Sequence, residues 1–355
     1  MIRFRDVVLT SVLFLIVFTG CTDNPFRSTD SKPDQMIAFS TGANLVVISP
    51  EGDLLHEISQ IPAYQYSWST DASMLVGFPA FTQYPYLIDL ESSTYNIFEK
   101  PYWGGTDWLD GTRFIALRSD SLFVINAQTL ESEFLHRGSN PHLSPNKRKL
   151  AYTHDGHVYI RDLESSESHR IVDAALEPGN YRWAPKSNFL AIRKGSDLWR
   201  YSPDGPGIRL TENEEPILHV EWSPFGNRIA YINNRHELIV INADGSGKTI
   251  LAEEVSIRDF SWSPDARYIA FHTSEPINER RSTTNITIVP SDGGEVRLLA
   301  ENAMNARWLQ SHNQVVYFDM EERSLIRSDP DGQNRFVIFE NDASAHFSLS
   351  PVAGR

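Results

Sequence analysis

Five of the eleven histidines in this sequence lie between residues 136 and 169, a density that could indicate a metal site. They are His136, His142, His154, His157 and His169. Zinc requires three or four ligands that converge in space. The histidines at 154 and 157 flank an Asp-Gly dipeptide, which is typical of a tight turn and explains the pair without a metal. We therefore expect solvated loop histidines and no metal site.

Other catalytic patterns are weak. The segment 329–334 (DPDGQN) offers several oxygen ligands. However, a calcium loop of the helix–loop–helix kind needs about twelve residues and a closing Glu, so a hairpin turn explains the segment better. The nucleophile motif G-x-S-x-G does not occur in the sequence. We predict no catalytic residues and no cofactor.

Two aromatic-rich segments, 77–86 and 99–107, are the strongest candidates for partner binding. Their aromatic residues are Phe78, Phe81, Tyr84, Tyr86, Tyr102 and Trp103. Exposed aromatic side chains on rigidly held loops often mark contacts with a protein or with stacked sugar rings. Alternatively, the two loops pack on each other and bury these side chains.

These segments interrupt a repeat of about forty residues, which is the main regularity of the chain. Each unit has an anchor residue followed by a turn signal such as Ser-Pro, in which proline presets the backbone angle of a type I turn. The anchors are Trp68, Trp108, Leu143, Trp183, Trp222, Trp262, Trp308 and Leu349.

Short apolar stretches follow each anchor. After Trp222, for example, come Ile229–Tyr231, then Leu238–Ile241, then the hairpin signal at 243–245. Each unit thus predicts four short strands, and no stretch has the 3.6-residue apolar period of a long helix. Four-stranded units repeated at this interval are typical of β-propeller blades, so the expected fold class is all-β.

The two ends of the repeat complement each other. Residues 37–60 match the last three strands of a unit, whereas 345–351 match an anchor strand alone. Joined, they form one blade from both termini. This gives an eight-bladed propeller of four-stranded blades with N/C-terminal strand closure. The alternative is seven blades, and 99–150 is the stretch where the count could fail.

The residue just before each anchor is polar in every unit. These residues are Ser67, Asp107, His142, Arg182, Glu221, Ser261, Arg307 and Ser348. Alternation along a strand places them together on one face, so the larger ones (Asp107, His142, Arg182, Glu221 and Arg307) are candidates to line the central channel. Alternatively, they satisfy backbone groups and pair with one another between blades.

The beginning of the chain predicts export. Residues 1–20 combine Arg3 and Arg5 with an apolar run from Val7 to Phe18, which is typical of a secretory signal peptide and too short to span a bilayer. Cys21, the only cysteine, follows directly. The alternative is an ordinary signal with a chance cysteine.

The segment Phe18-Thr19-Gly20-Cys21 resembles the lipobox of bacterial lipoproteins. That resemblance implies acylation of Cys21 and, with Thr22 after it, retention on the periplasmic face of the outer membrane of a Gram-negative cell. Residues 21–35 then form a polar, flexible tether, and 36–355 form a single propeller domain. We expect contact with the membrane through the N-terminal lipid only.

The repeat itself resembles that of TolB-like propellers. Trp222-Ser223-Pro224 with Ile229-Ala230-Tyr231, and Trp262-Ser263-Pro264-Asp265 with Ile269-Ala270-Phe271, carry the resemblance. It implies the fold over about 37–355 rather than a role, because TolB has an α/β domain before its propeller and only the tether precedes this one. Similar repeats cap prolyl oligopeptidase-type peptidases, but their G-x-S-x-G motif is missing here.

Composition narrows the partners. The net charge of -14 argues against nucleic acid, which needs a basic surface. We expect a monomeric, lipid-anchored envelope scaffold that binds another envelope protein or a peptide. The alternatives are a propeller enzyme or a sensor that acts on or binds polysaccharide or a small ligand; convergent carboxylates near Asp107 and Glu221 would favour the enzyme.

Overall fold

The structure is a computed structural model that describes residues 33–61, 63–79, 83–172, 181–203, 205–212, 215–253, 256–278, 281–340, 343 and 345–352. The chain divides into two units, Met1–Lys32 and Pro33–Arg355, and all described residues belong to the second. The expected signal segment, Cys21 and Phe81 therefore lie outside the described residues. Among the described residues, no helix has the length and apolar character that a membrane crossing requires.

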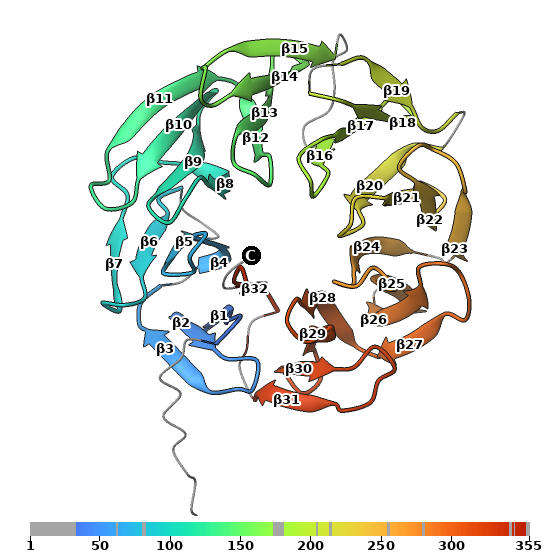
Figure 1. Ribbon diagram of the computed structural model, residues 1–355. Helices are drawn as coiled ribbons and strands as arrows, with labels where there is room; N and C mark the ends of the chain where they lie inside the picture. Colours follow the sequence, from blue (N-terminus) through green and yellow to red (C-terminus); the bar gives the residue numbers. More distant parts are fainter. Residues whose placement is uncertain are drawn as a thin grey trace, which may run out of the picture. The chain divides into compact units, whose positions relative to one another are not determined.

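The second unit consists of eight four-stranded antiparallel sheets arranged in a ring (Figure 1). The innermost strands are β4 (Ala63–Trp68), β8 (Trp103–Trp108), β12 (Ser139–Leu143), β16 (Tyr181–Trp183), β20 (Ile217–Trp222), β24 (Ile257–Trp262), β28 (Ala303–Leu309) and β32 (Phe347–Leu349). Every predicted anchor ends its strand or, for Trp308, precedes the last residue. The eight-bladed prediction is confirmed, and the seven-bladed alternative is wrong.

Each innermost strand is followed outward by three more. The second strands are β5 (Met74–Pro79), β9 (Arg113–Arg118), β13 (Lys149–His154), β17 (Leu190–Lys194), β21 (Arg228–Asn233), β25 (Tyr268–Asn278), β29 (Gln314–Asp319) and β1 (Ile37–Thr41). The third strands are β6 (Tyr86–Asp89), β10 (Ser121–Asn126), β14 (His157–Asp162), β18 (Asp197–Tyr201), β22 (Glu237–Asn242), β26 (Arg281–Pro290), β30 (Ser324–Ser328) and β2 (Asn44–Ile48). The outer strands are β7 (Thr94–Ile97), β11 (Ser132–Arg137), β15 (Ser168–Val172), β19 (Gly207–Arg209), β23 (Thr249–Glu253), β27 (Arg297–Ala300), β31 (Phe336–Phe339) and β3 (Leu54–Ile58).

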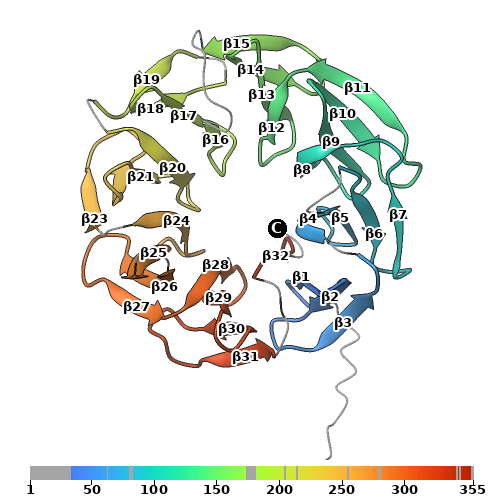
Figure 2. The same cartoon turned by 180° about the vertical axis from the view of Figure 1, so that it is seen from behind.

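We number the blades along the chain, from blade 1 (β4–β7) to blade 7 (β28–β31), and Figure 2 shows the same circular order from behind. Blade 8 is composite, with the order β3-β2-β1-β32. The innermost strands finish at the end of the ring that we call the turn face. The opposite end, where the innermost strands begin, is the loop face.

Blade 8 joins the two termini by backbone and side-chain bonds. Ile37 is paired with Leu349 in the antiparallel register of β1 and β32. The buried side chain of Gln35 donates to the carbonyl oxygen of Ser350 at 2.9 Å and accepts the N–H of Gln310, also at 2.9 Å. The expected closure from both ends is confirmed, and Gln35 extends it to blade 7.

The core lies between blades rather than within them. The buried apolar side chains of the described residues form eight clusters, and each cluster joins two neighbouring blades. Between blades 5 and 6, for example, Trp262 and Phe271 pack with Ile232 and Leu238. Because each blade needs its neighbours to cover its two apolar faces, the fold depends on a closed ring.

The turn after each anchor explains the Ser-Pro signal. In blade 6, Ser263 is fully buried and its hydroxyl accepts the N–H of Tyr268 at 2.9 Å, which closes the hairpin between β24 and β25. Ser223 accepts the N–H of Arg228 at 3.1 Å in the same way in blade 5. The hydroxyl thus satisfies a buried backbone donor that would otherwise lack a partner.

The short spacing between Trp108 and Leu143 has a local cause. A single residue, Gly138, separates β11 from β12 and adopts a φ of +148°. A Cβ at this position would lie 2.7 Å from the carbonyl oxygen of Thr153, so only glycine fits. The stretch 99–150 therefore holds a complete blade despite its irregular spacing.

Candidate functional site

The aromatic segments contribute two strongly exposed side chains to the loop face. Trp103 is 47% exposed at the start of β8, and Tyr84 is 44% exposed in the connection between β5 and β6. Phe78 and Tyr86 are half-buried, and Tyr86 packs edge-on against Tyr95. The backbone joins the two segments, because Tyr102 donates its N–H to the carbonyl oxygen of Gln83 at 2.8 Å. The two segments are therefore neighbours.

Tyr102 is not exposed, which corrects the expectation from sequence. It is only 3% exposed and packs edge-on against Phe98 and Phe123, with ring centroids 5.6 and 6.5 Å away. Arg118 donates a hydrogen bond of 3.3 Å to its hydroxyl. Tyr102 and Trp103 are adjacent in the chain, so their side chains point to opposite sides. We call the exposed pair, Tyr84 and Trp103, the aromatic rim.

Three of the five channel candidates interact with one another. The carboxylate of Asp107 accepts the N–H of Leu143 at 2.7 Å, so it satisfies a backbone donor of the next blade. His142 packs edge-on against Tyr181 at 5.4 Å. Burial lowers the pKa of His142; the nearby Asp107 opposes this shift and Arg182 adds to it.

The other two candidates, Glu221 and Arg307, belong to a charged cluster on blades 5 to 7. His219 Nε2 lies 3.4 Å from a carboxylate oxygen of Glu221 and 3.7 Å from one of Asp259. Arg307 lies 3.7 Å from the other oxygen of Asp259. His219 and Asp259 were not among the residues predicted from sequence.

A second periodic position would have identified them. Three residues before each anchor the chain has Gln65, Gly105, Asn140, Asn180, His219, Asp259, Asn305 and His346. All but the glycine are polar. In a regular strand, alternation puts this position on the same face as the polar residue next to the anchor, as for His219 and Glu221 of blade 5. Asn140 and Asn305 have a positive φ and lie at register shifts, so the alternation does not extend to every blade.

The anchor tryptophans also form hydrogen bonds to the innermost strands of neighbouring blades. Four indole N–H groups donate to the backbone oxygen that precedes the anchor of the previous blade: Trp108 to Ser67 (3.2 Å), Trp183 to His142 (2.9 Å), Trp222 to Arg182 (3.0 Å) and Trp308 to Ser261 (3.1 Å). Trp68 donates instead to the hydroxyl of Ser348 at 2.9 Å. Trp262 Nε1 is buried and has no hydrogen-bond partner among the described residues.

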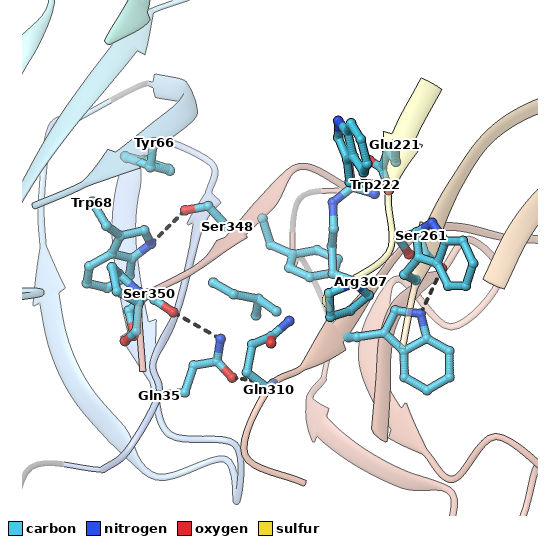
Figure 3. A pocket seen from close by; sticks show the side chains of 16 residues that line it. Gln35, Tyr66, Trp68, Glu221, Trp222, Ser261, Arg307, Gln310, Ser348 and Ser350 are labelled. Carbon is cyan, nitrogen blue, oxygen red and sulfur yellow. Dashed lines mark hydrogen bonds between the residues drawn. The ribbon is translucent and has the colours of Figure 1, made fainter. Parts of the chain in front are cut away.

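A cavity of about 700 Å³ opens at the turn face of the channel. Its lining comes from blades on both sides of the ring, with Tyr66, Trp68 and Ser348 facing Glu221, Ser261 and Arg307 across it (Figure 3). Gln35 lies at its edge, bonded to Ser350 (Figure 3). Asp107, His142 and Arg182 do not line this cavity.

The accessible groups of the cavity are polar rather than aromatic. Its four indoles, from Trp68, Trp222, Trp262 and Trp308, are between 3% and 8% exposed. The side chains of Glu221 and Arg307 are 35% and 42% exposed. A bound molecule would therefore contact the carboxylate of Glu221 and the guanidinium of Arg307, whereas little of the four indoles is within its reach.

The histidine-rich stretch does not gather at one point. His136 and His154 contact each other, with ring centroids 5.7 Å apart. His142 packs against Tyr181, and His169 is hydrogen-bonded to the backbone oxygen of Pro203 at 2.6 Å. Among the described residues, no three His, Cys, Asp or Glu side chains are arranged to hold a metal ion.

No family model matches the chain. It is 25% identical over 176 residues to prolyl endopeptidase FAP of Bos taurus, an alignment that covers 40% of this chain and 23% of the relative. The chain thus matches under a quarter of the length of these curated relatives.

Among solved structures, it is similar to dihydro-heme d1 dehydrogenase NirN in complex with DHE, with a TM-score of 0.67, 12% identity and coverage of 94% of this chain and 79% of that one. It also matches a putative TolB from Agrobacterium tumefaciens, with a TM-score of 0.42, 18% identity and coverage of 68% and 92%. At these identities the NirN likeness shows the β-propeller fold and nothing about activity.

Proposed function

We propose that this propeller is a protein-binding scaffold of the cell envelope, and that the aromatic rim contacts its partner. The partner is another envelope protein or a peptide. The proposal includes a lipid anchor at Cys21, a place on the periplasmic side of the outer membrane, a monomeric state and no catalysis.

The exposure of Trp103 and Tyr84 carries the proposal. Of the aromatic residues described in these two segments, Tyr102, Phe78 and Tyr86 are buried or half-buried, and their packing against the cores between blades accounts for them. That packing leaves nearly half of the Trp103 and Tyr84 side chains in water. Tryptophan and tyrosine are the residues that most often dominate binding energy at protein interfaces.

The backbone beneath the aromatic rim is well supported. Trp103 begins a strand and pairs with Leu117 of β9, and two backbone bonds, Tyr102 to Gln83 and Phe98 to Pro85 (3.1 Å), join the two segments. A rigid surface loses less conformational entropy on binding than a mobile one, which favours affinity.

Affinity capture from the native envelope tests the proposal. The tagged, lipidated protein would be compared with the double variant Trp103→Ala/Tyr84→Ala and with Phe225→Ala. Phe225 is the control because it is also an exposed aromatic residue (56%) but lies in the turn after Trp222, on the turn face. We expect the wild-type protein and the control to capture the same partner, and the double variant to lose it.

A circular dichroism melt of each variant checks that the fold is intact. Retention of the partner by a folded double variant would overturn the role of the aromatic rim.

A further inference from the structure

The cavity at the turn face has a chemical character that the aromatic rim does not explain. Two residues of opposite charge line it, Glu221 of blade 5 and Arg307 of blade 7. The blade between them contributes the small side chain of Ser261 (Figure 3). The cavity volume of about 700 Å³ is within the usual range of ligand sites.

Blade 6 contributes one polar side chain to this cavity, that of Ser261, which is partly exposed. Its hydroxyl oxygen is covered and has no hydrogen-bond partner within the described part of the chain. The next residue, Trp262, leaves the opposite face of the strand, and its indole packs in the core between blades 5 and 6. A rotation about the Cα–Cβ bond of Ser261 can turn its hydroxyl toward a molecule in the cavity.

Arg307 indicates which chemical group the cavity can bind. Arg307 Nη1 donates a hydrogen bond to the backbone oxygen of Ala306 at 2.9 Å and lies 3.7 Å from a carboxylate oxygen of Asp259. Both contacts use the same terminal nitrogen, and Nη2 takes part in neither. A guanidinium forms two parallel hydrogen bonds to a carboxylate, and this pairing is among the strongest in proteins. Ser261 next to it adds a hydroxyl, which is also suited to a carboxylate oxygen.

Glu221 and two apolar residues, Phe347 and Leu349, indicate what the rest of the bound molecule is. A carboxylate accepts the N–H of a peptide bond, and it would not be placed opposite the guanidinium to bind a second anion. Phe347 and Leu349 are half-buried and line the cavity, so an apolar side chain can contact them. A sugar fits poorly, because sugars stack on open aromatic faces and these indoles are almost fully covered.

We propose that the central cavity captures the C-terminal carboxylate of a peptide chain that ends in an apolar residue. Arg307 and Ser261 bind the carboxylate, Glu221 accepts a backbone N–H, and Phe347 and Leu349 contact the last side chain. The peptide is either a short free peptide or the C-terminal tail of a protein, since both present the same chemistry. This site is distinct from the aromatic rim, and either can fail without the other.

Calorimetric titration of the full chain tests the proposal. The probe is N-acetylated alanyl-alanyl-phenylalanine as the free acid, and the control probe is the same peptide with a C-terminal amide. We expect the acid to bind and the amide to bind at least about tenfold more weakly, because the amide lacks the charge that pairs with Arg307. Equal affinities, or no saturable binding of the acid up to about 10 mM, would overturn the proposal.

Variants locate the site. Arg307→Gln should weaken binding of the free-acid peptide by at least about tenfold. Arg182→Gln is the matched control, because Arg182 holds the same position on blade 4 and does not line the cavity. Full affinity in Arg307→Gln would contradict the proposal. The acid–amide comparison on the wild-type chain remains decisive if that variant does not fold.

Two further arms separate the alternatives. Binding of the same tripeptide at the C-terminus of a carrier protein supports protein tails as the ligand, whereas binding of the free peptide alone supports short peptides. Trp103→Ala/Tyr84→Ala should bind the free acid as the wild-type chain does, so loss of the envelope partner and loss of peptide binding are distinguishable.

Discussion

The indole N–H of Trp222 donates a hydrogen bond to the backbone oxygen of Arg182, 3.0 Å away, and joins blade 5 to blade 4. The acceptor is the residue before the anchor of the previous blade, and three other tryptophans bond to the same position. The anchors thus serve as links of the ring as well as core residues. Trp262 is the exception, since its indole N–H has no partner among the described residues.

This difference between two similar residues predicts a difference in stability. Trp222→Phe and Trp262→Phe remove the same ring volume from positions that are 7% and 5% exposed. Only the first also leaves a buried carbonyl oxygen without its donor. We expect the urea midpoint to show that Trp222→Phe costs about 1 kcal/mol more than Trp262→Phe. Equal losses would mean that the indole–carbonyl bond contributes nothing.

The closure of blade 8 should depend on one amide side chain. Gln35→Ala removes two hydrogen bonds and leaves the carbonyl oxygen of Ser350 and the N–H of Gln310 unpaired, so we expect a loss of about 2 to 3 kcal/mol in thermal or urea unfolding. Gln128→Ala is the control, because Gln128 is exposed in a turn of blade 2 and its loss should change stability by less than about 0.5 kcal/mol. If Gln35→Ala leaves the stability unchanged, backbone pairing alone closes the blade.

Truncation of two adjacent aromatic residues should destabilise the protein by very different amounts. Tyr102→Ala opens a hole among Phe98, Phe123 and Phe114, and we expect it to destabilise the protein by about 3 to 5 kcal/mol. Trp103→Ala removes a side chain that is 47% exposed and should cost less than about 1 kcal/mol. Denaturant unfolding of both variants checks this. A stable Tyr102→Ala would show that the cluster repacks.

A buried histidine should make stability depend on pH. Burial lowers the pKa of His272 below 6.5; Asp259 opposes this shift and Arg307 adds to it. Below about pH 6.5 the unfolded chain therefore binds a proton that the folded chain does not, and stability, complete above that pH, falls as the pH drops toward the folded pKa.

The variant that isolates this effect is His272→Gln, whose amide oxygen can still accept the N–H of Ala306. We expect it to reduce the slope of unfolding free energy against pH between about 6.5 and 5, with the remaining slope including the contribution of His142, whose pKa is also lowered. Urea midpoints measured across this range would show it. An unchanged slope would assign the dependence to other groups.

The ring could be predicted from sequence because its signals are local. Five of the eight anchors are followed within a few residues by a Ser-Pro or Asp-Gly dipeptide, and such turns form from the local sequence whatever the position of the blade in the ring. The burial of Tyr102 could not be predicted, because it depends on Phe98 and Phe123, which reach it from other strands.

Part of the candidate site could be predicted from the sequence. Glu221 and Arg307 were found from the position next to the anchor, and His219 and Asp259 could have been found by extending the same alternation two residues back. The indole–carbonyl bonds could not, because they depend on how the strands of neighbouring blades are aligned, and nothing in a single repeat specifies that alignment.

The composite blade also fixes when the protein can finish folding. Gln35 and Ser350 are 315 positions apart, and β1 to β3 have no innermost partner until residues 347–349 exist. Until then the sheet of β1 to β3 lacks its innermost strand, and Trp68 lacks the Ser348 hydroxyl to which its indole N–H donates. A chain that stopped before residue 347 would thus carry seven finished blades and an incomplete eighth, and such partly folded chains are substrates for chaperones and proteases.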